Sequence, residues 1–246
     1  MGLALDLDGV LWLAGEPIAG AADAVARLRA AGLEVVFCTN NSSQTVADVE
    51  AKLARQGIPP DGAVITSAMA AATLFEAGER VLVCGGPGVV EAIEGRGATP
   101  VRGGAADAVV VGLDLSFDYD RLRAAATAVL GGARLIATND DATYPTADGP
   151  IPGGGAIVAA VERATGVRAT VAGKPHPAMV GLVRARLGAD GVMVGDRPET
   201  DGLFAVALGY RFALVLSGVT ASASDVRPAP DLVGSDLAAL TGQLMA

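Results

Sequence analysis

Short apolar runs alternate with longer stretches of helical periodicity along most of the chain. Residues 20–31 and 45–56 read as helices, and apolar positions three and four apart recur in residues 177–188 and 200–209. Runs rich in β-branched residues predict a strand that begins at residue 3 and further strands at residues 34–38, 63–65, 191–195 and 212–216. Strands that alternate with helices are typical of βαβ units, so the pattern predicts an α/β fold with a parallel sheet.

The middle of the chain repeats this alternation without the acidic residues found near both ends. The expected strands and helix of this part cover residues 80–85, 106–113, 119–130 and 133–139. Glycine clusters separate these elements. We therefore interpret residues 77–167 as an inserted second domain, and residues 1–76 together with 168–246 as the main domain.

Composition and charge exclude several classes of protein. The chain has 246 residues, 51% of them hydrophobic, with a formal net charge of −9, which argues against nucleic acid and anionic membranes as partners. Its longest near-apolar run, residues 203–219, is interrupted by Gly209 and Arg211 and does not predict a membrane span. Arginine is far more frequent than lysine, and the only lysines are Lys52 and Lys174.

The cysteines favour a reducing compartment. Cys38 and Cys84 each lie inside an apolar run, which favours buried thiols over a disulfide. A secretory signal is not expected, because the first aspartate already occurs at position 6. We therefore expect a cytoplasmic protein.

Chemistry enters first in the stretch "LALDLDGVLW", residues 3–12, where an apolar run acquires Asp6 and Asp8. Side chains two apart on a strand point to the same side, and ligands bind at the carboxyl ends of strands in an open α/β sheet. Two carboxylates crowded there repel each other unless a cation joins them or one carries a proton. A pair of exposed turn aspartates is the alternative interpretation.

Three further loops that follow predicted strands carry polar groups. "TNNS" supplies Thr39, Asn40 and Asn41 after the second strand; a helix cap would explain Ser42 or Ser43 but not the whole group. "AGKPHP" contains Lys174, and an ammonium group there suits contact with a phosphate and an aspartate together. The last loop, "GDRPETD", contributes Asp196 and Asp201.

The motifs "DLDGV", "TNNS", "GKP" and "GDRPETD" occur in the order in which the haloacid dehalogenase (HAD) superfamily carries them, and the chain resembles that superfamily. "TSAMAA" at residues 66–71 and the segment at residues 137–166 are similar to the NagD-like subgroup, which includes glycerol-phosphate and pyridoxal phosphatases. This resemblance implies a Rossmann-like parallel-sheet core with a large α/β cap domain inserted between the second and third motifs.

The resemblance also implies a hydrolase that releases phosphate from a phosphate monoester. Asp6 would attack phosphorus and form an aspartyl-phosphate, and Asp8 would protonate the leaving alcohol and then activate water. Thr39 would hydrogen-bond a phosphoryl oxygen, and Lys174 would balance negative charge.

Metal binding follows from the same resemblance and from charge. A phosphate ester brings two negative charges to a site that already holds several carboxylates, so we expect Mg²⁺ as cofactor. Asp6, Asp196 and the main-chain carbonyl of Asp8 would bind the metal directly, and Asp201 would act through a metal-bound water.

The cap implies a small phosphorylated metabolite as substrate, because a domain of this size closes over the site. Asn40 and Asn41 are expected to bind this substrate. Tyr144 falls where relatives carry a residue that helps to select it, although a packed loop aromatic fits the sequence equally well. Caps of this kind often mediate dimers in the family, so both a monomer and a homodimer remain open.

Three other features are less specific. The glycines of "PGGGA", residues 152–156, favour a helix start over a phosphate loop, because no G-K-[ST] follows them. His176, the only histidine, is interpreted as a loop residue near a helix start. Arg197 could contact a phosphate or solvent, and the sequence does not decide between them.

Alternative functions share parts of this pattern. A phosphotransferase or mutase would use the same first half-reaction, and the residues do not distinguish water from a sugar hydroxyl as acceptor. A receiver-like phosphorylation switch fits less well, because receivers place their acidic pair and their phosphorylated aspartate on different strands. An inactive scaffold is disfavoured, since every expected catalytic position is filled. The substrate remains open among glycerol phosphate, pyridoxal phosphate, nucleotides and sugar phosphates.

Overall fold

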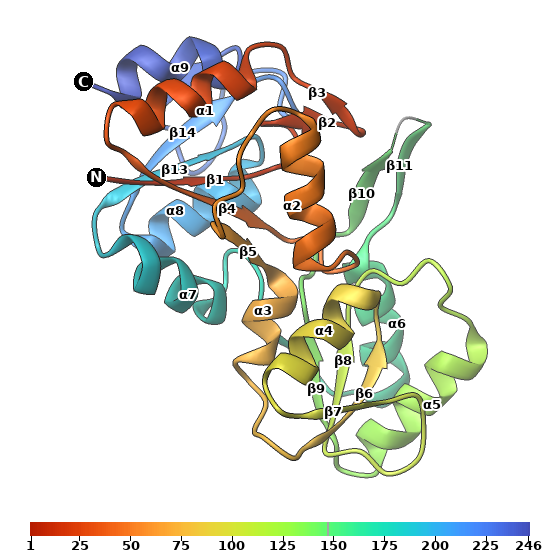
Figure 1. The fold of residues 1–246 in the computed structure, drawn as a ribbon. Helices are drawn as coiled ribbons and strands as arrows, with labels where there is room; N and C mark the ends of the chain where they lie inside the picture. The colour runs from red at the N-terminus through yellow and green to blue at the C-terminus, as the bar shows by residue number, and fades with distance from the viewer. Residues whose placement is uncertain (147) are drawn as a thin grey trace. The chain divides into compact units, whose positions relative to one another are not determined.

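The computed structural model describes residues 1–146 and 148–246, which fold into two compact units. The unit that contains both chain ends, here the terminal unit, consists of Met1–Thr39, Ala47–Ile65 and Lys174–Ala246. The inserted unit consists of Asn40–Val46 and Thr66–Gly173. Each unit is built around its own sheet (Figure 1).

A six-stranded sheet forms the centre of the terminal unit. Its strands are β1 (Gly2–Leu5), β4 (Glu34–Thr39), β5 (Val64–Thr66), β13 (Gly191–Gly195), β14 (Arg211–Val215) and β15 (Leu232–Gly234). The spatial order is β15-β14-β13-β1-β4-β5, and β1 pairs in parallel with both β13 and β4. Every residue of β1 is buried. A central parallel strand is covered on both faces, which explains its continuous apolar sequence.

Helices cover both faces of this sheet. They are α1 (Ala21–Ala30), α2 (Val46–Arg55), α7 (Pro177–Leu187), a short π-helix (Pro198–Gly202), α8 (Leu203–Leu208) and α9 (Leu237–Leu244). α1 packs on α9 and on β4, whereas α7 packs on β4 and β1 from the opposite face (Figure 1). A two-stranded ribbon of β2 (Trp12–Leu13) and β3 (Glu16–Pro17) follows β1. The helix expected at residues 200–209 starts later, at Leu203, because the π-helix occupies the preceding residues.

The inserted unit contains a second parallel sheet. Its strands are β6 (Arg80–Cys84), β7 (Thr99–Val101), β8 (Ala108–Val111), β9 (Arg134–Ala137) and β12 (Thr170–Val171), in the order β12-β9-β8-β6-β7. An antiparallel hairpin is formed by β10 (Thr143–Thr146) and β11 (Gly149–Pro152). The helices of this unit are α3 (Ser67–Ala72), α4 (Pro87–Gly95), α5 (Tyr119–Leu130) and α6 (Gly154–Thr165).

Alternation along β6 and β8 builds the hydrophobic core of the inserted unit. Leu82 and Cys84 on β6, with Val109 and Val111 on β8, point to the same face and pack in one cluster with buried residues of α5 and α6. The residues between them, such as Val110, are also fully buried. Burial on both faces requires helices on both sides, and α4 packs on β6 and β7.

The inserted unit is larger than expected: it includes Asn40–Val46, which the sequence assigned to the main domain, and its second segment has wider limits. It resumes at Thr66 and ends at Gly173, whereas the sequence placed its limits at residues 77 and 167. The physical reason at the first limit is that α3 packs against α4, so α3 groups with the inserted residues. The glycine run at residues 152–156 starts a helix, as expected, with Gly153 as the N-cap of α6.

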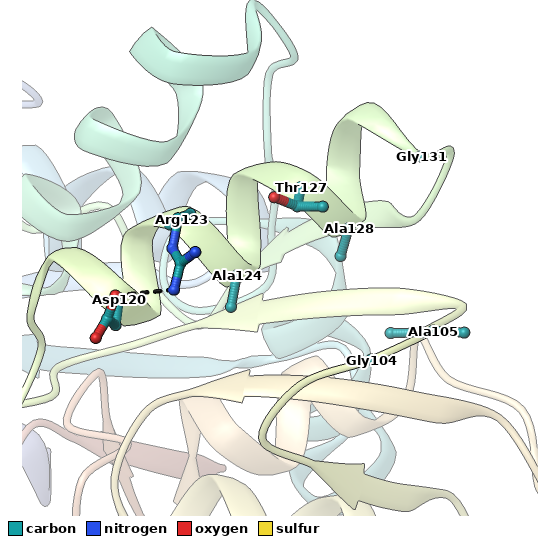
Figure 2. A pocket seen from close by; sticks show the side chains of 9 residues that line it. Gly104, Ala105, Asp120, Arg123, Ala124, Thr127, Ala128 and Gly131 are labelled. Atoms are coloured by element: carbon teal, nitrogen blue, oxygen red, sulfur yellow. Dashed lines mark hydrogen bonds and ion pairs between the residues drawn. The ribbon is translucent and has the colours of Figure 1, made fainter.

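A hollow of about 550 Å³ runs along α5 in the inserted unit (Figure 2). Small side chains such as Ala124 and Ala128 line it, together with the segment at residues 104–106. Arg123 and Asp120 form an exposed ion pair of 3.0 Å at its edge. The site residues expected from the sequence lie elsewhere.

Among the described residues, no helix combines the length and the apolarity that crossing a bilayer requires.

Candidate active site

The polar residues expected from the sequence follow neighbouring strands of the terminal sheet. Asp6 directly follows β1, Thr39 ends β4, and Asp196 directly follows β13. Because β13, β1 and β4 are adjacent and run parallel, these three residues share the carboxyl edge of the sheet. This edge is where open α/β sheets bind ligands.

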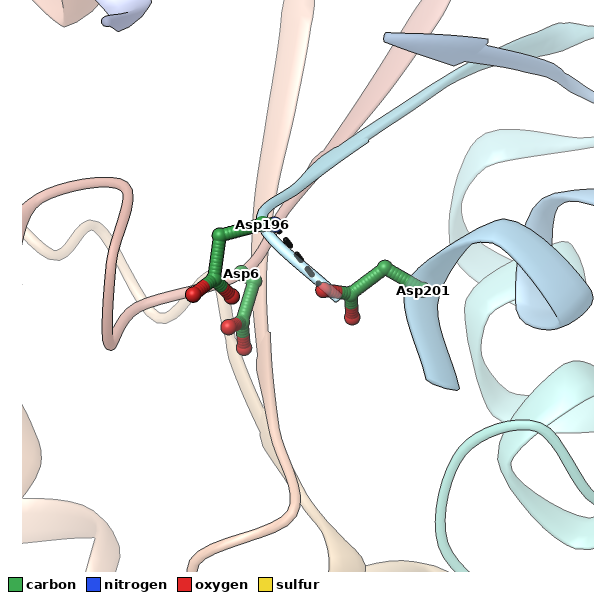
Figure 3. Close-up of side chains that lie close together, drawn as sticks. All are labelled: Asp6, Asp196 and Asp201. Carbon is green, nitrogen blue, oxygen red and sulfur yellow. Dashed lines mark hydrogen bonds between the residues drawn. The ribbon is translucent and has the colours of Figure 1, made fainter. Parts of the chain in front are cut away.

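Three carboxylates come together at this edge. Asp6, Asp196 and Asp201 each contribute an oxygen atom, and these oxygens lie within 4.8 Å of one another (Figure 3). All three residues are buried, with relative exposures of 8%, 2% and 1%. Lys174 lies among them: its Nζ donates to Oδ1 of Asp6 and to Oδ1 of Asp201, each at 2.7 Å. The structure thus joins the first, third and fourth sequence motifs.

The π-helix and the loop after β13 orient the two later aspartates. Oδ2 of Asp201 accepts hydrogen bonds from the backbone N–H groups of Asp196 and Arg197, both at 3.1 Å. Both oxygens of Asp201 therefore have partners within the protein. Oδ2 of Asp196 accepts from the backbone N–H of Val219 at 2.6 Å. Its Oδ1 is buried and has no hydrogen-bond partner among the described residues.

The sequence did not identify the loop after β14 as part of the site. Ser217 donates from Oγ to the carbonyl oxygen of Gly9 at 2.7 Å, and Val219 holds Asp196. A Cβ atom at Gly218 would overlap the carboxylate of Asp196. Gly9 has φ +85° and also packs on Asp196. The sequence did offer one signal: Ser217 is a small polar residue that follows the end of a strand, as the polar residues of the other motifs do.

Burial and like charges shift the titration of the cluster. Burial raises the pKa of Asp6 well above its usual value, and the charges of Asp201 and Asp196 oppose the lowering by Lys174. Burial, together with Asp201, raises the pKa of Asp196 to about 6. Burial disfavours the charged form of Lys174, but Asp201 and Asp6 outweigh it and raise its pKa well above the usual lysine value.

The cluster has the charge and the donors that a divalent cation requires. Three carboxylates face one ammonium group, which leaves an excess of two negative charges when all are ionised. One buried carboxylate oxygen, Oδ1 of Asp196, lacks a partner among the described residues. Carboxylate and carbonyl oxygens are the ligands that Mg²⁺ prefers. Asp6 and Asp196 therefore fit such an ion, whereas the oxygens of Asp201 already have hydrogen-bond partners.

Asp8 lies outside this group of carboxylates. Its Oδ1 accepts a hydrogen bond of 3.0 Å from Nε1 of Trp12. Burial raises the pKa of Asp8, while Lys52 and the bond from Trp12 lower it. A raised pKa favours a carboxyl group that can carry a proton, as a general acid must.

The residues expected to bind substrate lie in the inserted unit. Asn41 donates from Nδ2 to the hydroxyl of Tyr144 on β10 at 3.3 Å, and Asn40 donates to Oδ2 of Asp141 at 2.9 Å. The structure therefore brings Asn41 and Tyr144 together. Asn139, which the sequence did not single out, donates to the carbonyl oxygen of Asn40 at 2.7 Å.

The two less specific residues have different surroundings. His176 is the N-cap residue of α7, at the helix start where the sequence placed it, and makes no side-chain capping bond. Arg197 lowers the pKa of both Asp8 and Asp196, so its positive charge acts on the site.

Comparison with known families agrees with these motifs. A family model described as haloacid dehalogenase-like hydrolase matches residues 3–99, which contain the first two motifs. A second HAD-hydrolase-like model matches residues 171–240, which contain the last two.

Several named relatives match nearly the whole chain. D-glycerol 3-phosphate phosphatase of Mycobacterium tuberculosis is 38% identical over 97% of this chain and 70% of its own length. The 5′-nucleotidase YutF of Bacillus subtilis is 36% identical over 89% of this chain and 88% of its own. A crystal structure of glycerol phosphate phosphatase from M. tuberculosis with magnesium superposes with a TM-score of 0.90 at 36% identity, covering 99% of this chain and 78% of that one. The p-nitrophenyl phosphatase of Archaeoglobus fulgidus gives a TM-score of 0.91 at 29% identity, over 99% and 98% of the two chains.

Proposed function

Because the chain belongs to the haloacid dehalogenase-like hydrolase family, we propose that it is a Mg²⁺-dependent phosphatase that hydrolyses a small phosphate monoester. The observation that carries this proposal is the buried group of three carboxylates around one ammonium. A phosphate monoester dianion is repelled by that group unless a divalent cation offsets the charge. The magnesium in the structure of the mycobacterial phosphatase supports the choice of metal.

Asp6, Asp196 and the carbonyl oxygen of Asp8 are the groups proposed to hold the metal. Oδ1 of Asp196 is buried without a partner among the described residues, which suits it to bind a metal ion. Asp201, whose oxygens already have partners, orients Lys174 and the backbone of the loop. When bound, Mg²⁺ neutralises phosphoryl charge and orients the ester.

Asp6 is proposed as the nucleophile. An oxygen of its carboxylate attacks phosphorus in line, the bond from phosphorus to the alcohol oxygen breaks, and an aspartyl-phosphate forms on Asp6. Lys174 holds Oδ1 of Asp6 at 2.7 Å, which fixes the rotation of the carboxylate. Its charge also offsets the phosphoryl group that Asp6 acquires.

Asp8 and Thr39 complete the chemistry. Asp8, protonated at first, gives its proton to the leaving oxygen and becomes a carboxylate. It then takes a proton from the water that attacks phosphorus, which releases phosphate and restores Asp6. Thr39, buried at the end of β4, is proposed to hydrogen-bond a phosphoryl oxygen.

The inserted unit is proposed to act as a cap that selects the substrate. Asn40, Asn41 and Tyr144 belong to it, and the bond between Asn41 and Tyr144 presents both side chains together. We propose small phosphorylated metabolites as substrates, consistent with the named activities of the relatives. Action in the cytoplasm, without nucleic acid or membrane partners, agrees with the net charge of −9 and with the two free cysteines.

A phosphate-release screen tests the proposal. The purified protein is incubated with glycerol phosphates, sugar phosphates, nucleotides, pyridoxal phosphate and p-nitrophenyl phosphate, with Mg²⁺ or with EDTA. We expect turnover of at least one ester that EDTA abolishes and Mg²⁺ restores.

Asp6→Asn and Asp23→Asn form the matched pair for the nucleophile. Both variants exchange one carboxylate for an amide, but Asp23 is exposed in the first turn of α1 and is not part of the carboxylate cluster. Asp6→Asn should be folded and inactive, and only enzyme with an intact Asp6 should gain the mass of one phosphoryl group after an acid quench during turnover. Normal phosphate release by folded Asp6→Asn would contradict the assignment.

A further inference from the structure

Three side chains of the terminal unit form a column that ends at the proposed general acid. Nε1 of Trp12 donates to Oδ1 of Asp8 at 3.0 Å. Nζ of Lys52 lies over the ring of Trp12, 3.9 Å from the ring centroid. This distance is well inside the range of a cation–π interaction. The order of contact is therefore ammonium, indole and carboxyl group.

The backbone makes this column rigid. The turn that follows Asp6 is closed by a hydrogen bond of 2.6 Å from the N–H of Gly9 to the carbonyl oxygen of Trp12. Trp12 is only 2% exposed, so its ring cannot turn away into solvent. Lys52 is carried by α2, whose buried residues Val49 and Leu53 attach that helix to the unit.

The choice of residue type is also informative. Lysine occurs twice in a chain that otherwise uses arginine. Lys174 contacts Asp6 and Asp201, and Lys52 contacts the ring that holds Asp8. Both lysines therefore act on aspartates of the proposed active site, one directly and the other through an indole.

We propose that Trp12 and Lys52 are positioning residues that determine which oxygen of Asp8 carries the catalytic proton. An indole N–H can only donate, so Oδ1 of Asp8 must accept. In a neutral carboxyl group the carbonyl oxygen is the better acceptor, which leaves the proton on Oδ2. Among the described residues, the hydrogen bond to Asp8 is made by Oδ1 alone, and we assign Oδ2 to the leaving group of the substrate. This inference rests on the proposed phosphatase function.

Proton transfer then proceeds with a balanced change of charge. As the phosphorus–oxygen bond breaks, the proton on Oδ2 moves to the alcohol oxygen, and Asp8 becomes a carboxylate. The new negative charge is stabilised by the indole N–H, and the ammonium over the ring makes that N–H a stronger donor. When water attacks the aspartyl-phosphate, Oδ2 recovers a proton and the cycle closes.

A first test is independent of activity. Trp12 is the only tryptophan, so a ¹⁵N-labelled sample gives a single indole N–H resonance in the NMR spectrum. Asp8→Asn and Lys52→Met should each shift this resonance, whereas Arg55→Met should leave it in place. Arg55 is the matched control, because it removes a positive charge from the same helix at an exposed position. An indole resonance that is unchanged in Lys52→Met would overturn the proposed contact.

A second test uses the leaving group. A p-nitrophenolate ion leaves readily without a proton, whereas an alkyl alcohol does not, so only the alkyl ester depends strongly on Asp8. Trp12→Phe, which retains an aromatic ring but lacks the N–H, should lower kcat/KM for the best alkyl phosphate about tenfold. For p-nitrophenyl phosphate the loss should be less than about twofold. Lys52→Met should show the same selectivity with about a threefold loss, and Lys52→Arg should restore activity.

The two tests separate this inference from the proposed function. Equal losses on both esters in Trp12→Phe and Lys52→Met would indicate a purely structural role and overturn the inference. If Trp12→Phe does not fold, the Lys52 variants decide alone, since that side chain is partly exposed. Wild-type protein that hydrolyses no ester would refute the phosphatase proposal, while the indole resonance would still report whether the column exists.

Discussion

Replacing Lys174 by methionine tests the charge balance on which the proposed site depends. The ammonium group donates to Asp6 and Asp201, each at 2.7 Å, and the lysine side chain is only 2% exposed. Methionine retains a similar length and fills the same space without a charge. The substitution therefore removes one positive charge from a buried group and leaves three carboxylates together.

The magnitude follows from the contacts that are lost. Each hydrogen bond to a charged group contributes about 1.5–3 kcal/mol, and removal of one partner from a buried ion pair costs about 3–5 kcal/mol. The side chain of Asp6 is 12% exposed and can take up a proton, which limits the loss. We expect the free energy of unfolding to fall by about 3–4 kcal/mol at pH 7 in metal-free buffer.

The loss should depend on pH in a defined direction. Lys174 lowers the pKa of Asp6, so its removal raises this pKa further above the value in the unfolded chain. A carboxyl group whose pKa is higher in the folded than in the unfolded chain does not destabilise the fold at a pH below its pKa in the unfolded chain. It destabilises the fold as the pH rises through its pKa in the folded chain. The difference between variant and wild type should therefore be smaller at pH 5 than at pH 8.

Urea denaturation at pH 5, 7 and 8, with EDTA or with Mg²⁺, measures these differences. Lys52→Met is the matched control: it removes the only other lysine, which is half-buried, and should cost less than about 1 kcal/mol. Added Mg²⁺ should narrow the gap between Lys174→Met and wild type, since it replaces the missing positive charge. A loss below about 1 kcal/mol at pH 7 in EDTA would refute the charge argument.

Three further predictions concern the same unit and the buried thiols. Gly218→Ala should lower Mg²⁺ affinity at least about tenfold by calorimetry, because its Cβ would displace the carboxylate of Asp196, and unchanged affinity would contradict this role. Burial raises the pKa of Asp196 from 3.8 to about 6. In EDTA, the contribution of this group to the free energy of unfolding is therefore fully present below about pH 4, and about 2–3 kcal/mol is lost as the pH rises through 6. This pH dependence of the free energy of unfolding should be absent in Asp196→Asn. Burial raises the pKa of Cys38 to about 12 and that of Cys84 to about 11. Both thiols should therefore react with a disulfide reagent at pH 8 much more slowly in the native than in the unfolded protein. Rapid reaction of the native protein would show that the thiols are accessible.

Local periodicity was sufficient for several of the longer elements. The helix expected at residues 119–130 coincides with α5, and the strands expected at residues 34–38 and 191–195 match β4 and β13. These segments bury a regular set of side chains, so the pattern of the sequence reflects their environment. β15 has three residues and none is fully buried, so it carries no such pattern and was not predicted.

The motifs were visible because their residue types are unusual at strand ends, but their partners were not. Lys174 and Asp6 are separated by 168 residues, and nothing in either segment specifies the other. The loop that holds Asp196 through Val219 was not assigned to the site, because a backbone N–H leaves no signature in the sequence. The contact of Trp12 with Asp8 was missed for a related reason, since Trp12 reads as one more apolar residue.

By itself, the sequence determined the α/β class, the presence of an inserted unit and the side chains available for chemistry, because periodicity and residue type are local properties. Only the tertiary structure decided which oxygen of each carboxylate has a partner and which does not. That depends on how β1, β13 and the π-helix place atoms from distant segments within hydrogen-bonding distance. The residue types therefore specify which chemical groups are present at this edge of the sheet. Tertiary packing specifies how the atoms of these groups are arranged.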